Sequence, residues 1–170
     1  MTQRNQLSKR LEKFLIEHKA KYKVLQHRTV FTAFDTAQTL KVDLGSVAKT
    51  LIVQMDRGLA LVVIPADRNL DFAKLKKLVN LQRKAQGLAT LKKVALTTER
   101  SIASKVAKKP GAIVPFGALY KLGTYVDKSL LQEPHIILNA GSFEVSFSMR
   151  GSTYGKLADA VVGQFSKKRN

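Results

Sequence analysis

Apolar residues recur along the chain at two different spacings, and these predict helices and strands in alternation. In residues 4–20, apolar side chains such as Leu11 and Leu15 return every three to four positions, which is typical of an amphipathic helix. Residues 47–55 and 59–65 are instead almost continuously apolar, which is typical of buried strands. The Asp-Arg-Gly sequence between them predicts a tight hairpin turn.

The same two patterns assign the rest of the chain. Shorter strands are expected at residues 22–27, 92–96, 123–127, 135–140 and 143–149, the last two forming a hairpin across Gly141. Further helices are expected at residues 32–40, from about residue 71 through 84, at residues 98–107 and at about residues 153–165. Thr32 and Asp35 form a capping-box-like start for the first of these helices, and Ser152 or Thr153 is expected to cap the last.

Hairpins are too frequent in this assignment for an all-parallel sheet. We therefore expect an α/β fold of the α+β type, with a mixed, largely antiparallel sheet and flanking helices. The 170 residues favour a single domain spanning 1–170, with a short basic tail at 166–170.

Lys49 conflicts with the strand in which it stands. At alternate positions it shares one face with Val47, Leu51 and Val53, and the opposite face is apolar too. A lysine is rarely buried without a partner. One interpretation is that its ammonium reaches solvent at the sheet edge, and the other is that it binds a ligand.

The net charge of +18 indicates a polyanionic partner, with nucleic acid the leading candidate. Between Phe72 and Val126, Glu99 is the only acidic residue. No apolar run approaches the ~20 residues of a membrane span, and no strongly amphipathic basic helix is evident, so we expect no membrane partner. By charge alone, candidate contacts to such a polyanion are Lys74, Lys76, Lys77, Arg83, Lys84, Lys108 and Lys109.

The chain lacks the common catalytic constellations. It has no cysteine, which fits a cytoplasmic protein, and no G-x-S-x-G elbow or Gly-rich phosphate loop. His18, His27 and His135 show no metal-ligand spacing, so neither a metal nor a cofactor is expected. The position of His18 favours a role in packing or at the end of the first helix. His27 lies at the exit from a predicted strand into a loop, where substrate contacts are common. An enzyme of this composition would work by positioning and electrostatics.

Six motifs follow one another in an order that resembles a known family. They are HRTVFT (27–32), VAKTL (47–51), VVIPADRNLD (62–71), GAIVP (111–115), YVD (125–127) and LNAG (138–141). Over roughly residues 10–165 the chain resembles the aminoacyl-tRNA deacylases of the YbaK/ProX type, which are related to the editing domain of prolyl-tRNA synthetase. From residues alone, the GAIVP segment is also compatible with a rigid connector.

The resemblance implies a pocket that holds the 3′ end of a mischarged tRNA and hydrolyses its aminoacyl ester. Lys49 would be the strand lysine needed for activity, and water the nucleophile, with backbone dipoles stabilising the oxyanion. The implied partners are mischarged tRNA, carrying a small amino acid and with tRNA(Pro) as one candidate, and an aminoacyl-tRNA synthetase. The implied substrate-binding residues are His27, Thr50, Gly111, Ala112, Ile113, Pro115, Asn139, Ala140, Gly141 and Ser146.

The sequence departs from the cysteine-specific branch of that family after the Ala-Gly turn. That branch carries an arginine-glycine pair followed by an acidic residue, whereas this chain has Phe143-Glu144 and then Ser146. The resemblance therefore does not carry cysteine specificity to this chain.

Two functions remain open from the sequence. The first is a free-standing trans-editing deacylase, and the alternative is a non-catalytic tRNA- or RNA-binding module of the same fold. A DNA-binding role is not supported, because the sequence shows no recognisable helix-turn-helix or zinc-binding signature.

Overall fold

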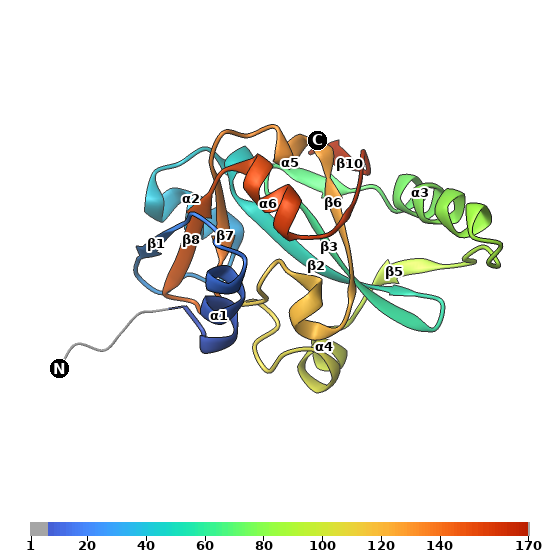
Figure 1. Ribbon diagram of the computed structural model, residues 1–170, viewed down its shortest axis with the longest axis horizontal. Coiled ribbons are helices and arrows are strands. Elements are labelled where there is room, and N and C mark those ends of the chain that lie inside the picture. The colour runs from blue at the N-terminus through green and yellow to red at the C-terminus, as the bar shows by residue number, and fades with distance from the viewer. Residues whose placement is uncertain (1–6, 170) are drawn as a thin grey trace.

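A five-stranded mixed sheet organises the computed structural model, which describes residues 7–169 (Figure 1). Two further sheets, of three and two strands, flank it. The strands of the large sheet, in spatial order, are β5 (Val94–Leu96), β2 (Ala48–Met55), β3 (Gly58–Pro65), β6 (Gly123–Asp127) and β9 (Val161–Gly163). β2 is antiparallel to β3 and β5, whereas β6 is parallel to β3 and β9. The predicted mixed sheet is confirmed.

The two central strands are apolar throughout because both faces of the sheet are covered. Ile52 and Leu61 point into the larger core on one face. Val53 and Val62 point into a second core on the other face, which includes side chains of α3 (Phe72–Ala85). Lys49 follows the alternation of Val53 and so belongs to the second face.

The three-stranded sheet lies beside α2 at the left of Figure 1. Its strands are β1 (Lys23–Gln26), β8 (Val145–Met149) and β7 (Ile136–Asn139), paired antiparallel in that order. The predicted hairpin across Gly141 is therefore present, with Gly141 at a φ of +86°. A parallel bridge between Val47 and Ile137 joins this sheet to the start of β2.

Short helices connect the strands. They are α1 (Lys9–Glu17), α2 (Ala33–Leu40), α4 (Glu99–Lys105), α5 (Lys128–Leu131) and α6 (Gly151–Leu157), with 3₁₀ turns η1 (Leu44–Ser46) and η2 (Gly117–Tyr120). The Thr32 hydroxyl caps α2 as predicted, accepting the Asp35 N–H at 3.1 Å. The Asp71 carboxylate caps α3 in the same way.

The C-terminal segment differs from the predicted helix over 153–165. The helix ends at Leu157, and its N-cap is Arg150 without a side-chain hydrogen bond, so capping by Ser152 or Thr153 is wrong. β9 then pairs with β6, and β10 (Ser166–Lys168) pairs antiparallel with β4 (Arg68–Leu70). The expected basic tail is thus an ordered strand up to Lys168. Its partners lie far away in the sequence, and local spacing could not indicate them.

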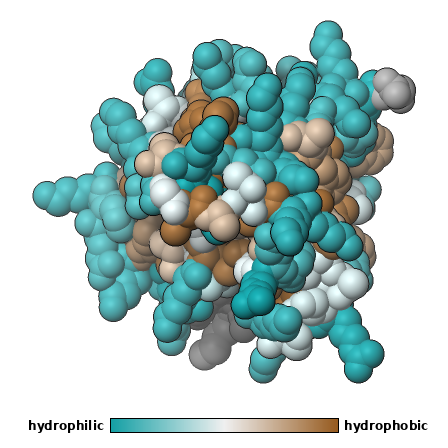
Figure 2. Space-filling model, turned by 90° about the vertical axis from the view of Figure 1, so that its right-hand side faces the viewer, coloured by the Kyte–Doolittle hydropathy of each residue, from teal (hydrophilic) through white to brown (hydrophobic). Residues whose placement is uncertain are grey.

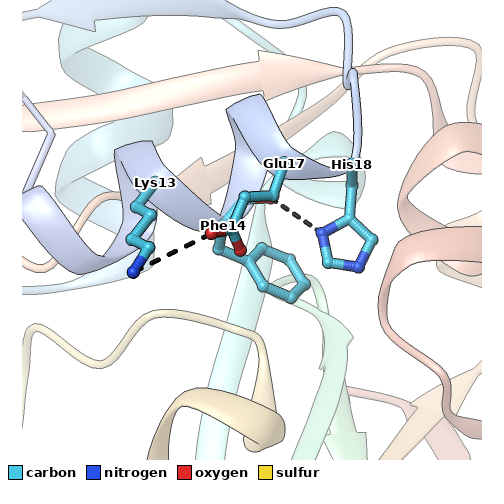
Figure 3. Close-up of polar contacts among 4 residues, drawn as sticks. All are labelled: Lys13, Phe14, Glu17 and His18. Atoms are coloured by element: carbon cyan, nitrogen blue, oxygen red, sulfur yellow. Dashed lines mark hydrogen bonds and ion pairs between the residues drawn. The ribbon is translucent and has the colours of Figure 1, made fainter.

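His18 completes the first helix, as the sequence favours. It is the C-cap residue of α1, and its Nδ1 lies 2.8 Å from the Phe14 carbonyl oxygen (Figure 3). Its ring also packs on the Phe14 ring, and Lys13 and Glu17 form an exposed ion pair beside it. The predicted residues 4–6 of this helix lie outside the described residues. Within residues 7–169, no helix is long and apolar enough to cross a membrane.

Candidate active site

A cavity of about 510 Å³ opens where the three-stranded sheet meets the start of β2. Its walls come from the segment after β1, α2, the first half of β2, the loop before η2, and the ends of β7 and β8. Five of the six sequence motifs thus contribute residues to one cavity, although they are spread from residue 27 to residue 141. Its volume is typical of small-molecule sites, which span about 300–1,000 Å³.

Lys49 lines this cavity from β2, half-buried, opposite Ile64 in the ladder. Burial lowers the pKa of its ammonium below 10.5, and the nearby positive charge of Arg169 lowers that pKa further. Among residues 7–169, no carboxylate forms an ion pair with it and no acceptor forms a hydrogen bond with it. A poorly hydrated cation without a protein partner attracts an anionic or developing anionic oxygen strongly.

His27 and Ser146 form a hydrogen-bonded pair in the cavity wall. The His27 Nδ1 lies 2.8 Å from the Arg28 carbonyl oxygen, so this nitrogen must carry the proton and donate it. In the neutral ring, Nε2 is then an acceptor, and the Ser146 hydroxyl donates to it at 2.9 Å. The Ser146 oxygen keeps lone pairs that can accept a hydrogen bond from a group in the cavity.

Two tyrosines anchor the loop over residues 110–116 at Val114 and Pro115. The Tyr120 hydroxyl accepts the Val114 N–H at 2.9 Å, and the buried Tyr154 hydroxyl donates to the Pro115 carbonyl at 2.7 Å. Gly111 and Ile113 line the cavity, and their N–H groups form no hydrogen bond with another described residue. Unpaired N–H groups at a cavity wall are the elements from which an oxyanion hole is built.

Phe143 and Glu144, which stand where the cysteine-specific branch has an arginine-glycine pair, fit this local structure. The Phe143 ring packs against the Phe31 ring with centroids 5.0 Å apart, and it would lie 3.2 Å from a Cβ placed on Gly111. The Glu144 carboxylate accepts hydrogen bonds from the Thr29 and Ser142 hydroxyls. The departure therefore supports the cavity wall through packing and hydroxyl contacts.

Some of the residues predicted to act on or bind the substrate line the cavity, and others do not. The predicted residues that line the cavity are His27, Lys49, Thr50, Gly111, Ile113, Asn139 and Ser146. Those that do not line it are Ala112, Pro115, Ala140 and Gly141. Ala112, Pro115 and Ala140 are buried, and Gly141 donates its N–H to the Asn139 side chain at 2.6 Å.

Sequence reasoning missed three features of the cavity. Phe31 and Phe34 line it while staying 66% and 52% exposed, which places aromatic rings at its rim. Arg169, which follows β10, also lines it. An exposed phenylalanine next to a conspicuous motif could have indicated the rim, but the position of Arg169 depends on a long-range strand pair.

The positively charged residues predicted to contact tRNA fall into two groups. Lys108 and Lys109 are exposed beside the cavity, and the Lys109 Nζ lies 5.6 Å from the centre of the Phe143 ring. The other group lies on α3, at the opposite end of the β2–β3 hairpin (Figure 1). Figure 2, which views the molecule from this end, shows long hydrophilic side chains around a smaller apolar centre. The α3 group is therefore not part of the cavity.

No cluster of three or more His, Cys, Asp or Glu side chains among residues 7–169 is arranged to hold a metal ion. The charged side chains that line the cavity are instead Lys49, Arg169 and Glu99, and the hydrogen-bonded pair of His27 and Ser146 lies beside them.

Comparisons with known proteins identify the family and the fold of this chain. The family model of the aminoacyl-tRNA editing domain matches residues 27–157. A hypothetical protein of known structure shares the fold with a TM-score of 0.78 and 20% identity, over 94% of this chain and all of its own. A proposed trans-editing enzyme for prolyl-tRNA synthetase does so with a TM-score of 0.74 and 22% identity, over 97% and 100%. No curated protein sequence matches the chain.

Proposed function

The chain belongs to the aminoacyl-tRNA editing domain family, and from this premise we propose that it is an aminoacyl-tRNA deacylase. It would bind the 3′ end of a mischarged tRNA and hydrolyse the ester that joins a small amino acid to the terminal adenosine. The observation that carries the proposal is the half-buried Lys49, which has no ion-pair partner among residues 7–169 and shares a cavity with Gly111 and Ile113.

The residues of the cavity support hydrolysis by water. Attack on the ester carbonyl places negative charge on its oxygen, and the Lys49 ammonium with the Gly111 and Ile113 N–H groups would stabilise that charge. The Ser146 oxygen, oriented by His27, would accept a hydrogen bond from the attacking water or from the substrate ammonium. No step in this scheme requires a covalent intermediate.

The rim of the cavity suits a single-stranded nucleic acid end. Unpaired bases stack on aromatic side chains, at about 1–3 kcal/mol per base. Phe31 and Phe34 present such rings beside the cavity, and Lys109 adds a positive charge near Phe143. The positively charged residues of α3 would contact the body of the tRNA. They would therefore strengthen the binding of full-length tRNA but not that of an isolated 3′ trinucleotide.

Synthetases separate amino acids that differ by one methylene by only about 1–3 kcal/mol, so a second, hydrolytic selection step is useful. The cavity carries Ser146 where the cysteine-specific branch has an acidic residue, and the amino acid removed must therefore be found by experiment.

A deacylation panel tests the proposal. The protein is incubated with tRNAs, including tRNA(Pro), charged with alanine, cysteine or serine, and the release of free amino acid is compared with spontaneous hydrolysis. Prolyl-tRNA(Pro) is the correctly charged comparison. We expect accelerated release from at least one mischarged tRNA and little from prolyl-tRNA(Pro). No acceleration for any mischarged tRNA, together with salt-dependent tRNA binding, would favour the non-catalytic RNA-binding alternative.

A further inference from the structure

Arg169 brings a second positive charge into the cavity from the C-terminal end of the chain. It lies beyond residues 27–157, which the family model matches, so this charge is outside the shared motifs. Its Nε donates to the Asn69 side-chain oxygen at 3.4 Å. Its two terminal nitrogens form no hydrogen bond with another described residue.

The strand that leads to Arg169 is firmly anchored. The buried Asp127 carboxylate accepts the N–H groups of Phe165 and Ser166, both at 2.9 Å. Phe165 is fully buried in the second core, and the Arg68 guanidinium donates to the hydroxyl and carbonyl oxygens of Ser166. Beyond Ser166, β10 stays paired with β4 as far as Lys168, which lies opposite Arg68, so the strand pairing extends to the residue before Arg169.

Arg169 and Lys49 both line the cavity, and within residues 7–169 no carboxylate forms an ion pair with either of them. Glu99 also lines the cavity, but within residues 7–169 no ion pair joins it to either cation. The charge of Arg169 also lowers the pKa of Lys49, after the larger effect of burial, which indicates that the two charges are close enough to repel each other. An anion that binds between two cations in a shared cavity offsets their mutual repulsion, so both positive charges favour anion binding.

The chemistry of the proposed substrate identifies that anion. The amino acid's carboxyl group is esterified and its amino group is cationic, so the aminoacyl moiety carries no negative charge. The negative charges nearest to the ester are the phosphodiesters of the terminal nucleotides. The planar guanidinium of arginine matches phosphate geometry with paired donors, which makes Arg169 better suited than Lys49 to this group.

We propose that Arg169 binds a phosphodiester of the last nucleotides of the tRNA and thereby positions the terminal ester against Lys49. This assignment rests on the proposed deacylase function and names the group by which its site recognises RNA. Arg169 is then a substrate-binding residue, whereas Lys49 contributes to hydrolysis.

Binding of an uncharged 3′ end tests the assignment without requiring activity. The trinucleotide CCA and the nucleoside adenosine are titrated into ¹⁵N-labelled wild-type protein, Arg169→Ala and the control Arg57→Ala, with amide shifts as the readout. Arg57 is an exposed arginine at the β2–β3 turn, at the opposite end of the molecule. We expect Arg169→Ala to weaken CCA binding about 10-fold or more and to leave adenosine binding unchanged.

The salt dependence of CCA binding gives a second readout. Loss of one phosphate contact to a single strand should reduce the slope of log K against log salt by about 0.7. Arg57→Ala should match the wild type in affinity and slope. An Arg169→Ala protein that binds CCA with wild-type affinity and slope would overturn the assignment, as would a wild type that binds CCA no better than adenosine.

A kinetic comparison separates failure of the assignment from failure of the proposed function. On mischarged tRNA, Arg169→Ala should raise KM, whereas hydrolysis of a phosphate-free aminoacyl-adenosine should proceed at the wild-type rate. If the wild type hydrolyses neither substrate, the deacylase function fails, and the CCA titrations still decide whether Arg169 binds phosphate. If Arg169→Ala slows both substrates equally, Arg169 acts on the ester and the phosphate assignment is wrong.

Discussion

Ser146 and His27 are arranged as a hydrolase nucleophile and its base would be, with the hydroxyl donating to the imidazole. In serine hydrolases the opposite ring nitrogen is held by a carboxylate, which stabilises the imidazolium that forms. Here that nitrogen donates to the neutral Arg28 carbonyl oxygen. We therefore assign Ser146 to hydrogen bonding of water or substrate rather than to covalent attack.

Replacing Ser146 by alanine tests this assignment. Loss of one hydrogen-bonding group of this kind costs about 0.5–1.5 kcal/mol, so Ser146→Ala should slow deacylation roughly 2–10-fold. Intact-protein mass spectrometry during turnover should find no aminoacyl adduct on the wild type. A loss of activity of three orders of magnitude, or an adduct on Ser146, would make this serine the nucleophile.

Single residues were predictable to the extent that their signal was local. Lys49 stood out because strand alternation placed a charge among apolar neighbours, and the structure places it in the cavity with no ion-pair partner within residues 7–169. His27 and Ser146 were identified by resemblance, but their hydrogen bond depends on the register between β1 and β8. Arg169 gave no local signal, because its position follows from a strand pair about a hundred residues apart.

At the scale of elements, β10 matters both for the stability of the fold and for the site, because it leads to Arg169 in the cavity. Asp127, at the end of β6, holds the segment that leads to β10 through two backbone N–H groups and also accepts from Ser129. Burial alone would raise the pKa of Asp127, but these hydrogen bonds outweigh it and lower the pKa below 3.8. The ionised carboxylate is therefore the form that stabilises the fold.

Asp127→Asn should lower the free energy of unfolding by about 3 kcal/mol, because an amide NH₂ would face backbone donors in place of an acceptor. Urea denaturation at pH 7 measures this difference. The contribution of the carboxylate is present above about pH 4 and is lost as the pH falls through the lowered folded-state pKa, so the difference should shrink in acid.

The control for this prediction is Asp159→Asn, at an exposed position with a φ of +47° that asparagine tolerates well. It should change the free energy of unfolding by less than about 0.5 kcal/mol. Equal effects of the two substitutions would show that Asp127 does not anchor β10.

Elements with local signals were predictable, and elements formed by distant pairing were not. The caps of α2 and α3 and the turn between β2 and β3 are encoded within a few residues. β9 lies within the helix predicted over 153–165, because its apolar residues also suit a helical spacing, and β10 lies within the predicted basic tail. Gly163 of β9 packs closely on α3: a Cβ there would lie 2.7 Å from Cδ2 of Leu78, and the Leu78 side chain would have to move.

At the scale of the whole molecule, the positive charge is divided between a cavity and a distant helix. The cavity at one end holds two cations beside aromatic rings, whereas α3 at the other end carries exposed lysines (Figure 1). A net charge of +18 predicted a polyanion but could not predict this division, since composition contains no spatial information. Two separate groups of positive charge suit the proposed ligand, an aminoacyl-tRNA, which is a long polyanion with a reactive ester at its 3′ end.

The central claim is that the ammonium of Lys49 promotes hydrolysis of the ester, and its direct test is the single-turnover rate of Lys49→Met. Methionine keeps an apolar stem and removes only the charge. Lys23→Met, at an exposed position on β1, is the matched control. The rate is measured on the mischarged tRNA that the wild type hydrolyses fastest, and thermal unfolding checks that each variant is folded.

We predict that Lys49→Met slows amino acid release by about 10²–10³-fold, as for the loss of one oxyanion-stabilising group. Its unfolding temperature should equal or exceed that of the wild type, because a half-buried cation that pairs with no carboxylate among residues 7–169 has been removed. Lys23→Met should match the wild type in both the rate of amino acid release and the unfolding temperature. A folded Lys49→Met protein that releases the amino acid within a few-fold of the wild-type rate would contradict the account.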